Sequence, residues 1–117
     1  MLLSRVMNLS ICIARMRSLL SRKDRDADWA HDVCTASRMI HIGVWAECPG
    51  KDEVRSTVLP LLKQAAVAIA AIGDGLDGEG REMLDRYAKN DELRWANIKE
   101  NYLQDKPSAF APDERDP

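Results

Sequence analysis

The chain has 117 residues, 45% of them apolar and 31% charged, and only six are aromatic. This length suits one domain with a hydrophobic core and excludes two, while the apolar share excludes a wholly disordered chain. The abundance of Ala, Leu, Arg, Glu and Asp, with few β-branched or aromatic residues, predicts an all-α fold. A net charge of −2 at pH 7 argues against binding of polyanions through the overall charge.

The charge is unevenly distributed along the chain. Residues 1–25 hold six basic side chains and one acidic side chain, whereas residues 74–117 hold seven basic and twelve acidic side chains. The first segment therefore carries a net charge of +5 and the last segment one of −5. This distribution favours pairing of the two ends within or between subunits, or presentation of one charged face to a partner.

The first predicted helix covers residues 2–23. Its apolar residues recur three and four positions apart, which is the period of one helix face. The positions of this stripe are Leu2, Val6, Leu9, Ile13, Met16 and Leu20. A translation start at Met7 instead of Met1 would begin the same helix later along the stripe, which we expect to pack on a second helix.

A polar hinge at residues 22–26 separates this helix from a second one, predicted over residues 27–47. Asp24 or Asp26 is suited to cap the start of the second helix, and the sequence Cys-Pro-Gly at residues 48–50 ends it. The inner face of the second helix is predicted to consist of Trp29, Val33, Ala36, Ile40 and Val44.

A third helix is predicted over residues 52–72, with the same spacing of apolar residues. The residues of this stripe are Val54, Val58, Leu61, Ala65, Ala68 and Ile72. Pro60 lies inside the pattern, so we expect a kink or a restart of the helix there.

A last helical segment is predicted over residues 79–104, after a Gly-rich connector. Its inner stripe is predicted to consist of Leu84, Trp95, Ile98 and Tyr102. Asn90 and Asp91 are suited to split this segment, with Asn90 as the cap of the second piece. The bundle would then have five helices instead of four.

We therefore predict an antiparallel bundle of four to five helices over residues 1–105, followed by a disordered, Pro-rich tail over residues 106–117. The most apolar stretch, residues 54–72, contains Arg55 and Lys63, so we expect no membrane span. The three cysteines form no CxxC pair, which is typical of reduced thiols in the cytoplasm.

Two groups of residues have the spacing of metal ligands. His31 and Cys34 lie three positions apart on the second helix, but no further side chain of that helix comes within zinc-bond distance. Glu79, Glu82 and Asp85 suit a hard cation, as the acidic motifs of all-α nucleotide pyrophosphohydrolases do, but a second Glu-x-x-Asp motif is missing. We assign no catalytic residue, metal or cofactor, and keep a metal-dependent enzyme that binds or hydrolyses nucleotides as an alternative.

A second alternative is a nucleic-acid binder that uses the basic end of the first helix. Five basic residues would contact phosphates there: Arg15, Arg17, Arg22, Lys23 and Arg25. No aromatic residue lies among them to stack on bases, and no helix-turn-helix or zinc-finger signature surrounds them. Nucleic acid is therefore not the favoured partner.

The favoured interpretation is a non-enzymatic interaction or regulatory protein that binds a macromolecular partner, with a protein as the expected partner. Tyr87, Arg94, Trp95 and Tyr102 lie on the last helix, and these are residue types that anchor protein interfaces. Together with Arg15, Arg22 and Arg25 of the first helix, these four residues form the predicted partner-binding set. We also expect a homo-oligomer, and chains of this composition are associated with accessory or inhibitor proteins of phages and mobile elements.

Overall fold

The computed structural model describes residues 8–73 and 75–103, and this part of the chain forms four helices and no β-strand. The first two are α2 (Leu9–Leu20) and α3 (Ala27–Glu47). The third is continuous through α4 (Lys51–Glu53), η1 (Val54–Val58) and α5 (Leu59–Gly73), and the fourth through α6 (Gly78–Ile98) and η2 (Lys99–Leu103). The predicted all-α fold is therefore confirmed.

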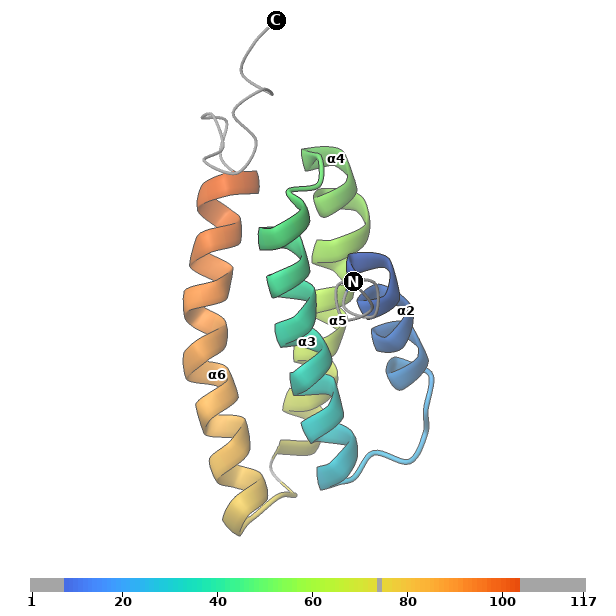
Figure 1. Ribbon diagram of the computed structural model, residues 1–117. Coiled ribbons are helices and arrows are strands. Elements are labelled where there is room, and N and C mark those ends of the chain that lie inside the picture. The colour runs from blue at the N-terminus through green and yellow to red at the C-terminus, as the bar shows by residue number, and fades with distance from the viewer. Residues whose placement is uncertain (1–7, 74, 104–117) are drawn as a thin grey trace, which may run out of the picture.

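The four helices run alternately down and up (Figure 1). The central helix α3 packs against α2 and α5 on one side and against α6 on the other, and η1 contacts η2 at the upper end. This is an antiparallel bundle in which neighbours in sequence point in opposite directions. The predicted tail at residues 106–117 and the first positions of the predicted first helix lie outside the described residues.

The core consists of the helix faces that the apolar spacing predicts. The buried residues of the predicted stripes are Leu9, Ile13, Met16, Trp29, Val33, Ala36, Ile40, Val44, Val54, Val58, Leu61, Ala65, Ala68, Leu84, Ile98 and Tyr102. Leu20, Ile72 and Trp95 are partly buried against this core. Burial of these faces is the main favourable contribution to folding.

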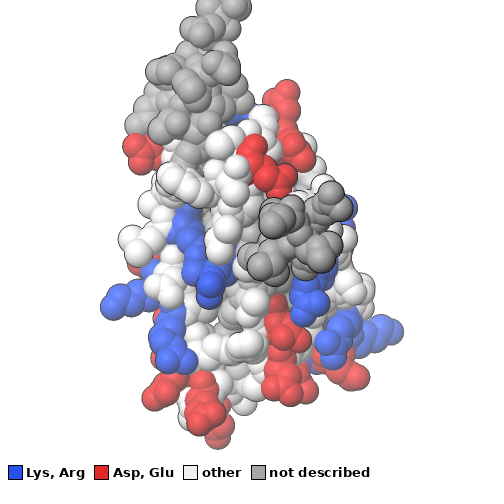
Figure 2. Space-filling view, viewed as in Figure 1, with Lys and Arg blue, Asp and Glu red and all other residues white. Residues whose placement is uncertain are grey.

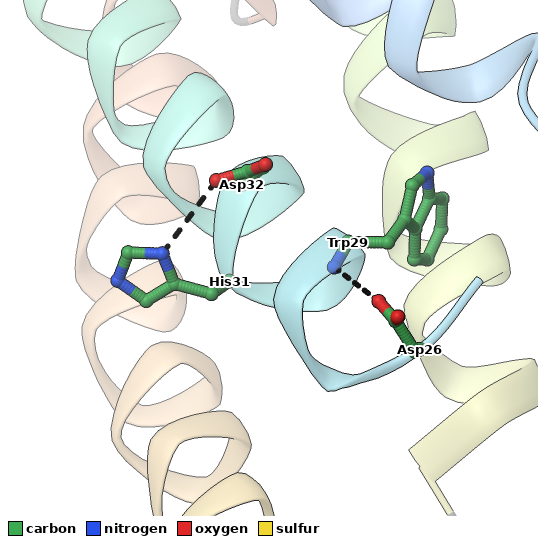
Figure 3. Close-up of polar contacts among 4 residues, drawn as sticks. All are labelled: Asp26, Trp29, His31 and Asp32. Atoms are coloured by element: carbon green, nitrogen blue, oxygen red, sulfur yellow. Dashed lines mark hydrogen bonds and ion pairs between the residues drawn. The ribbon is translucent and has the colours of Figure 1, made fainter. Parts of the chain in front are cut away.

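The hinge between α2 and α3 is fixed by polar contacts at its two ends. The Asp26 carboxylate accepts a hydrogen bond from the Trp29 backbone N–H (2.9 Å), as Figure 3 shows, and thereby caps α3. The buried Trp29 indole N–H donates to the Leu19 carbonyl at 2.8 Å. Arg25 donates to the Leu20 carbonyl at 2.8 Å, and its guanidinium carbon lies 4.9 Å from the Trp29 ring centroid.

The upper end of α2 is held against the last two turns of α3. The Leu9 backbone N–H donates to the Glu47 carboxylate, which places a negative charge at the N-terminus of α2. Gly43 permits close approach of the two helices, because a Cβ at that position would lie 3.3 Å from Cα of Leu9.

The chain passes Pro60 without a break, so the helix does not restart there. A wider turn precedes the proline: the Leu59 N–H donates to the Val54 carbonyl five residues earlier. Such a turn accommodates a proline ring inside a helix because it moves the preceding carbonyls apart.

The predicted split at Asn90 and Asp91 is wrong, since α6 continues through both residues. Asn90, the expected cap, is an exposed residue within the helix, and the neighbouring Asp91 directs its side chain towards His41 on α3.

The helix Lys51–Gly73 is long and apolar enough to cross a membrane, with a mean hydropathy of 1.5 over its most apolar window. About half of that window, 44%, is buried inside the bundle. Core helices of soluble proteins have the same length and composition, so this property does not distinguish the two classes.

Candidate interaction surface

The most distinctive surface lies where α3 and α6 run side by side in the same direction (Figure 1). We name it the α3–α6 seam and define it by six residues, Arg38, Ile42 and Trp45 on α3 and Arg86, Leu93 and Arg94 on α6. A spacing of seven residues keeps a side chain on one side of a helix, as for Arg38 and Trp45 on α3 and for Arg86 and Leu93 on α6.

Polar side chains join the two helices beneath this surface. The Tyr87 hydroxyl donates to the Ser37 hydroxyl at 3.2 Å. One turn higher, Nε2 of His41 lies 3.6 Å from Oδ1 of Asp91, with side chains that are 6% and 13% exposed. The Trp95 ring meets the His41 ring edge-on, with 6.2 Å between centroids and 76° between planes. Residues four apart on α3 are thus paired with residues four apart on α6.

Burial between α3 and α6 suppresses ionisation of two groups, the Cys34 thiol and the Tyr87 hydroxyl. Burial, with a further contribution from the Asp91 charge, raises the pKa of the Cys34 thiol to about 12, although Arg94 opposes this shift. Burial likewise raises the pKa of Tyr87 to about 12, against the lowering effect of its hydrogen bond with Ser37. A thiol with such a pKa is almost entirely protonated at neutral pH, so Cys34 is not an activated nucleophile.

A groove of about 280 Å³ opens above this polar layer. Its lining residues are His41, Ile42, Trp45, Leu93, Arg94, Asn97 and Ile98. The large apolar side chains at its rim are strongly exposed: Ile42 by 41%, Trp45 by 58% and Leu93 by 72%. Clustered exposed apolar residues of this size mark interaction sites in soluble proteins.

The arginines of the seam form no ion pair within residues 8–73 and 75–103. Arg38 and Arg86 are exposed and Arg94 is half-buried in the wall of the groove. Other arginines have internal partners: Arg81 lies 3.5 Å from the Asp85 carboxylate, and Arg55 donates to the Tyr102 carbonyl at 2.8 Å. The seam therefore combines exposed apolar groups with positive charge that the described chain does not neutralise.

The lower end of the same two helices is acidic. A second groove of about 420 Å³ lies there, lined by Ala27, Asp28, His31, Glu79, Gly80, Glu82, Met83 and Arg86. Figure 2 shows acidic side chains gathered at the lower ends of α6 and α3, and basic side chains over the middle of the face. The charge therefore changes along these two helices: the upper end of the α3–α6 surface is positive and apolar, and the lower end is negative.

The predicted partner-binding residues fall into three groups in the structure. Arg94 lines the groove of the seam. Tyr87 and Trp95 lie half-buried between α3 and α6, below the surface. Tyr102 is completely buried, so its ring is part of the core and is not presented at the surface.

The predicted arginines of the first helix lie on another part of the molecule. Arg15 and Arg22 are exposed, at and just beyond α2. Arg25 donates to the Leu20 and Arg22 carbonyls and stacks on Trp29, and so stabilises the hinge. The structure therefore does not bring these three arginines together with the residues of α6.

Sequence reasoning missed the apolar residues of the seam, Ile42, Trp45 and Leu93. Trp45 follows Val44 of the inner face, and the seven-residue spacing from His31 through Arg38 to Trp45 places it on the outer side of α3. This spacing was the available signal, since large apolar residues at outward positions point to an interface.

The residues with metal-ligand spacing do not form a site. His31 is 66% exposed and extends towards α6, with Nδ1 3.7 Å from the Asp32 carboxylate (Figure 3), whereas Cys34 is buried. Asp85 of the acidic series pairs with Arg81. Throughout residues 8–73 and 75–103, no three His, Cys, Asp or Glu side chains are close enough to share a metal ion.

No protein family model, no curated protein and no solved structure matches this chain. Function is therefore inferred from the seam itself.

Proposed function

We propose that this chain is a non-enzymatic interaction or regulatory protein that binds a macromolecular partner through the α3–α6 seam. The observation that supports the proposal is the exposure of Trp45 and Leu93 on facing turns of two packed helices. Burial of a large apolar side chain contributes about 1.5–3 kcal/mol, which makes these residues suitable anchors for a partner.

Rigidity of the seam favours the same function. Tyr87–Ser37 and His41–Asp91 link α3 to α6 directly below the anchors, so the rim is preorganised whenever α6 is packed on α3. Preorganised surfaces bind more tightly because less conformational entropy is lost in the complex. Arg94 adds a charged group at the edge of the apolar patch, as in many protein interfaces.

The proposal is tested by affinity purification from the native host with quantitative mass spectrometry. The bait is the full chain as wild type, as the double variant Trp45→Ala/Leu93→Ser, and as the control Val67→Ser, whose side chain is 71% exposed on α5. We expect the seam variant to lose the partners that the wild type and the control retain.

Retention of every partner by the seam variant would contradict the proposed site. Light scattering of the three proteins, run in parallel, shows whether the partner is a second copy of the chain. In that case the wild type and the control would be dimers and the seam variant a monomer.

A further inference from the structure

From the charge and shape of the α3–α6 seam, we propose that its partner is a protein segment in which a carboxylate lies within one helical turn of a large apolar side chain. This inference rests on the proposed function, because it names the chemistry of the partner for the same surface. The apolar side chain would enter the groove beside Trp45, and the carboxylate would pair with Arg94.

The upper seam carries positive charge without internal compensation. Arg94 lies in the wall of the groove and Arg38 is exposed one turn below Ile42 on α3, and neither has an ion-pair partner in the described part of the chain. Asp91, three residues before Arg94 on α6, is enclosed between the helices and faces His41. An acidic partner therefore meets complementary charge, which increases the association rate and selects against basic competitors.

The apolar groove determines which side chain the partner must carry next to its carboxylate. It is about 280 Å³ in volume and is bounded by Ile42, Trp45 and Leu93, with Ile98 behind them. Its volume accommodates one or two large apolar side chains, and its wall contains Arg94. Arg94 and the apolar rim line one groove, so the carboxylate and the apolar group of the partner must be close together in space, as they are within one helical turn of a single segment.

A nucleic acid fits the seam less well than an acidic protein. Asp28, Glu79 and Glu82 lie at the lower end of the same seam and would repel a polyanion that follows it. Ile42 and Leu93 at the rim are aliphatic and offer no stacking surface for bases, which leaves Trp45 alone.

The test is a selection of random peptides displayed on phage against the purified full chain. We expect enriched peptides to contain Asp or Glu within four residues of Leu, Ile, Phe or Trp. Enrichment should disappear with Trp45→Ala/Leu93→Ser and persist with Val67→Ser. For the best peptide, Arg94→Glu should weaken the affinity at least about tenfold, as should an increase of NaCl from about 50 mM to about 500 mM.

Arg38→Glu provides a second charge variant at a fully exposed position, and circular dichroism of each variant shows whether the helices remain folded. Peptides that need Trp45 and Leu93 but carry no acidic residue would overturn this inference and leave the proposed function intact. Peptides that bind all variants equally, or no enrichment at all, would overturn both. A labelled single-stranded oligonucleotide that binds through Arg94 when no acidic peptide is enriched would replace the inference with nucleic-acid binding.

Discussion

Nε2 of His41 and Oδ1 of Asp91 lie 3.6 Å apart between α3 and α6, and both side chains are almost completely enclosed. Within the described residues, neither atom has a hydrogen-bond partner. Each group therefore depends on the other for its electrostatic environment, and removal of one leaves the other buried without compensation. The pair lies one turn above the Tyr87–Ser37 hydrogen bond, between the same two helices.

A double-mutant cycle measures this dependence. We expect His41→Leu and Asp91→Asn to show a coupling energy of about 0.5–2 kcal/mol in urea unfolding at pH 7. The matched control is the exposed pair His31 and Asp32, 3.7 Å apart, for which the same substitutions should couple by less than about 0.5 kcal/mol. Equal coupling in the two cycles would show that enclosure of His41 and Asp91 has no energetic effect.

The second prediction concerns two glycines in helices. Gly43→Ala should destabilise the fold by about 1–3 kcal/mol, although alanine favours a helix by about 1 kcal/mol. The reason is space, since the new Cβ would lie 3.1 Å from Leu9 Cδ1 and 3.3 Å from its Cα. Gly80→Ala should stabilise the fold by about 0.5–1 kcal/mol, because its Cβ would meet Leu76 at an ordinary 3.6 Å. Thermal unfolding of both variants gives the signs, and the same sign for both would refute the close approach of α2 and α3.

The third prediction is that the three cysteines differ in reactivity. With iodoacetamide at pH 8, the exposed Cys48 should be alkylated first. Burial raises the pKa of Cys12 and raises that of Cys34 to about 12, so at pH 8 only about one Cys34 thiol in 10⁴ is ionised. Peptide mass spectrometry over time should therefore show one modified site in the native protein and three in denaturant. Early modification of Cys34 would indicate that α3 and α6 are not packed together.

The fourth prediction is a loss of stability at alkaline pH that depends on Tyr87. Its pKa is raised to about 12 in the folded protein, against about 10 in an unfolded chain. The unfolded state therefore loses its proton first, and the stabilisation present below pH 10 is lost as the pH rises to 12. The stability difference between wild type and Tyr87→Phe should fall by up to about 2–3 kcal/mol over this interval. Denaturant unfolding at pH 8, 10 and 11.5 measures it, and a constant difference would contradict the burial of Tyr87.

The helices and their buried faces were predictable from sequence, because the spacing of apolar residues by three and four positions indicates both a helix and the face that it buries. The stripe from Trp29 to Val44 is buried as expected, and Asp26 caps α3 as its position suggested. Asn90 misled the prediction because capping propensity is local, whereas the neighbouring Asp91 is used in a contact with α3 that no local pattern contains. Tertiary contacts decide such positions.

The candidate site was predictable only in part, and for a related reason. Arg94 was chosen from its residue type and does line the groove, whereas Tyr102, chosen on the same ground, belongs to the inner stripe of the helix and is buried in the core. Periodicity identifies which residues share a face and does not tell which neighbouring helix, if any, covers it. Trp45 and Leu93 become a pair only when α3 and α6 are placed side by side.

The shallow attachment of α6 has a consequence for the strength of any complex. This helix buries only Leu84 and Ile98 along its length, and a groove of about 500 Å³ separates it from α5. Its amide protons should therefore exchange with solvent sooner than those of α3, through subglobal opening that leaves the other three helices intact. A ligand that bridges α3 and α6 binds only when α6 is closed against α3. Leu84→Ala should favour the open state and so weaken binding, although Leu84 does not contact the ligand. The affinity for a ligand at the seam therefore depends on how firmly the inner face of α6 is packed, as well as on the residues of its outer face.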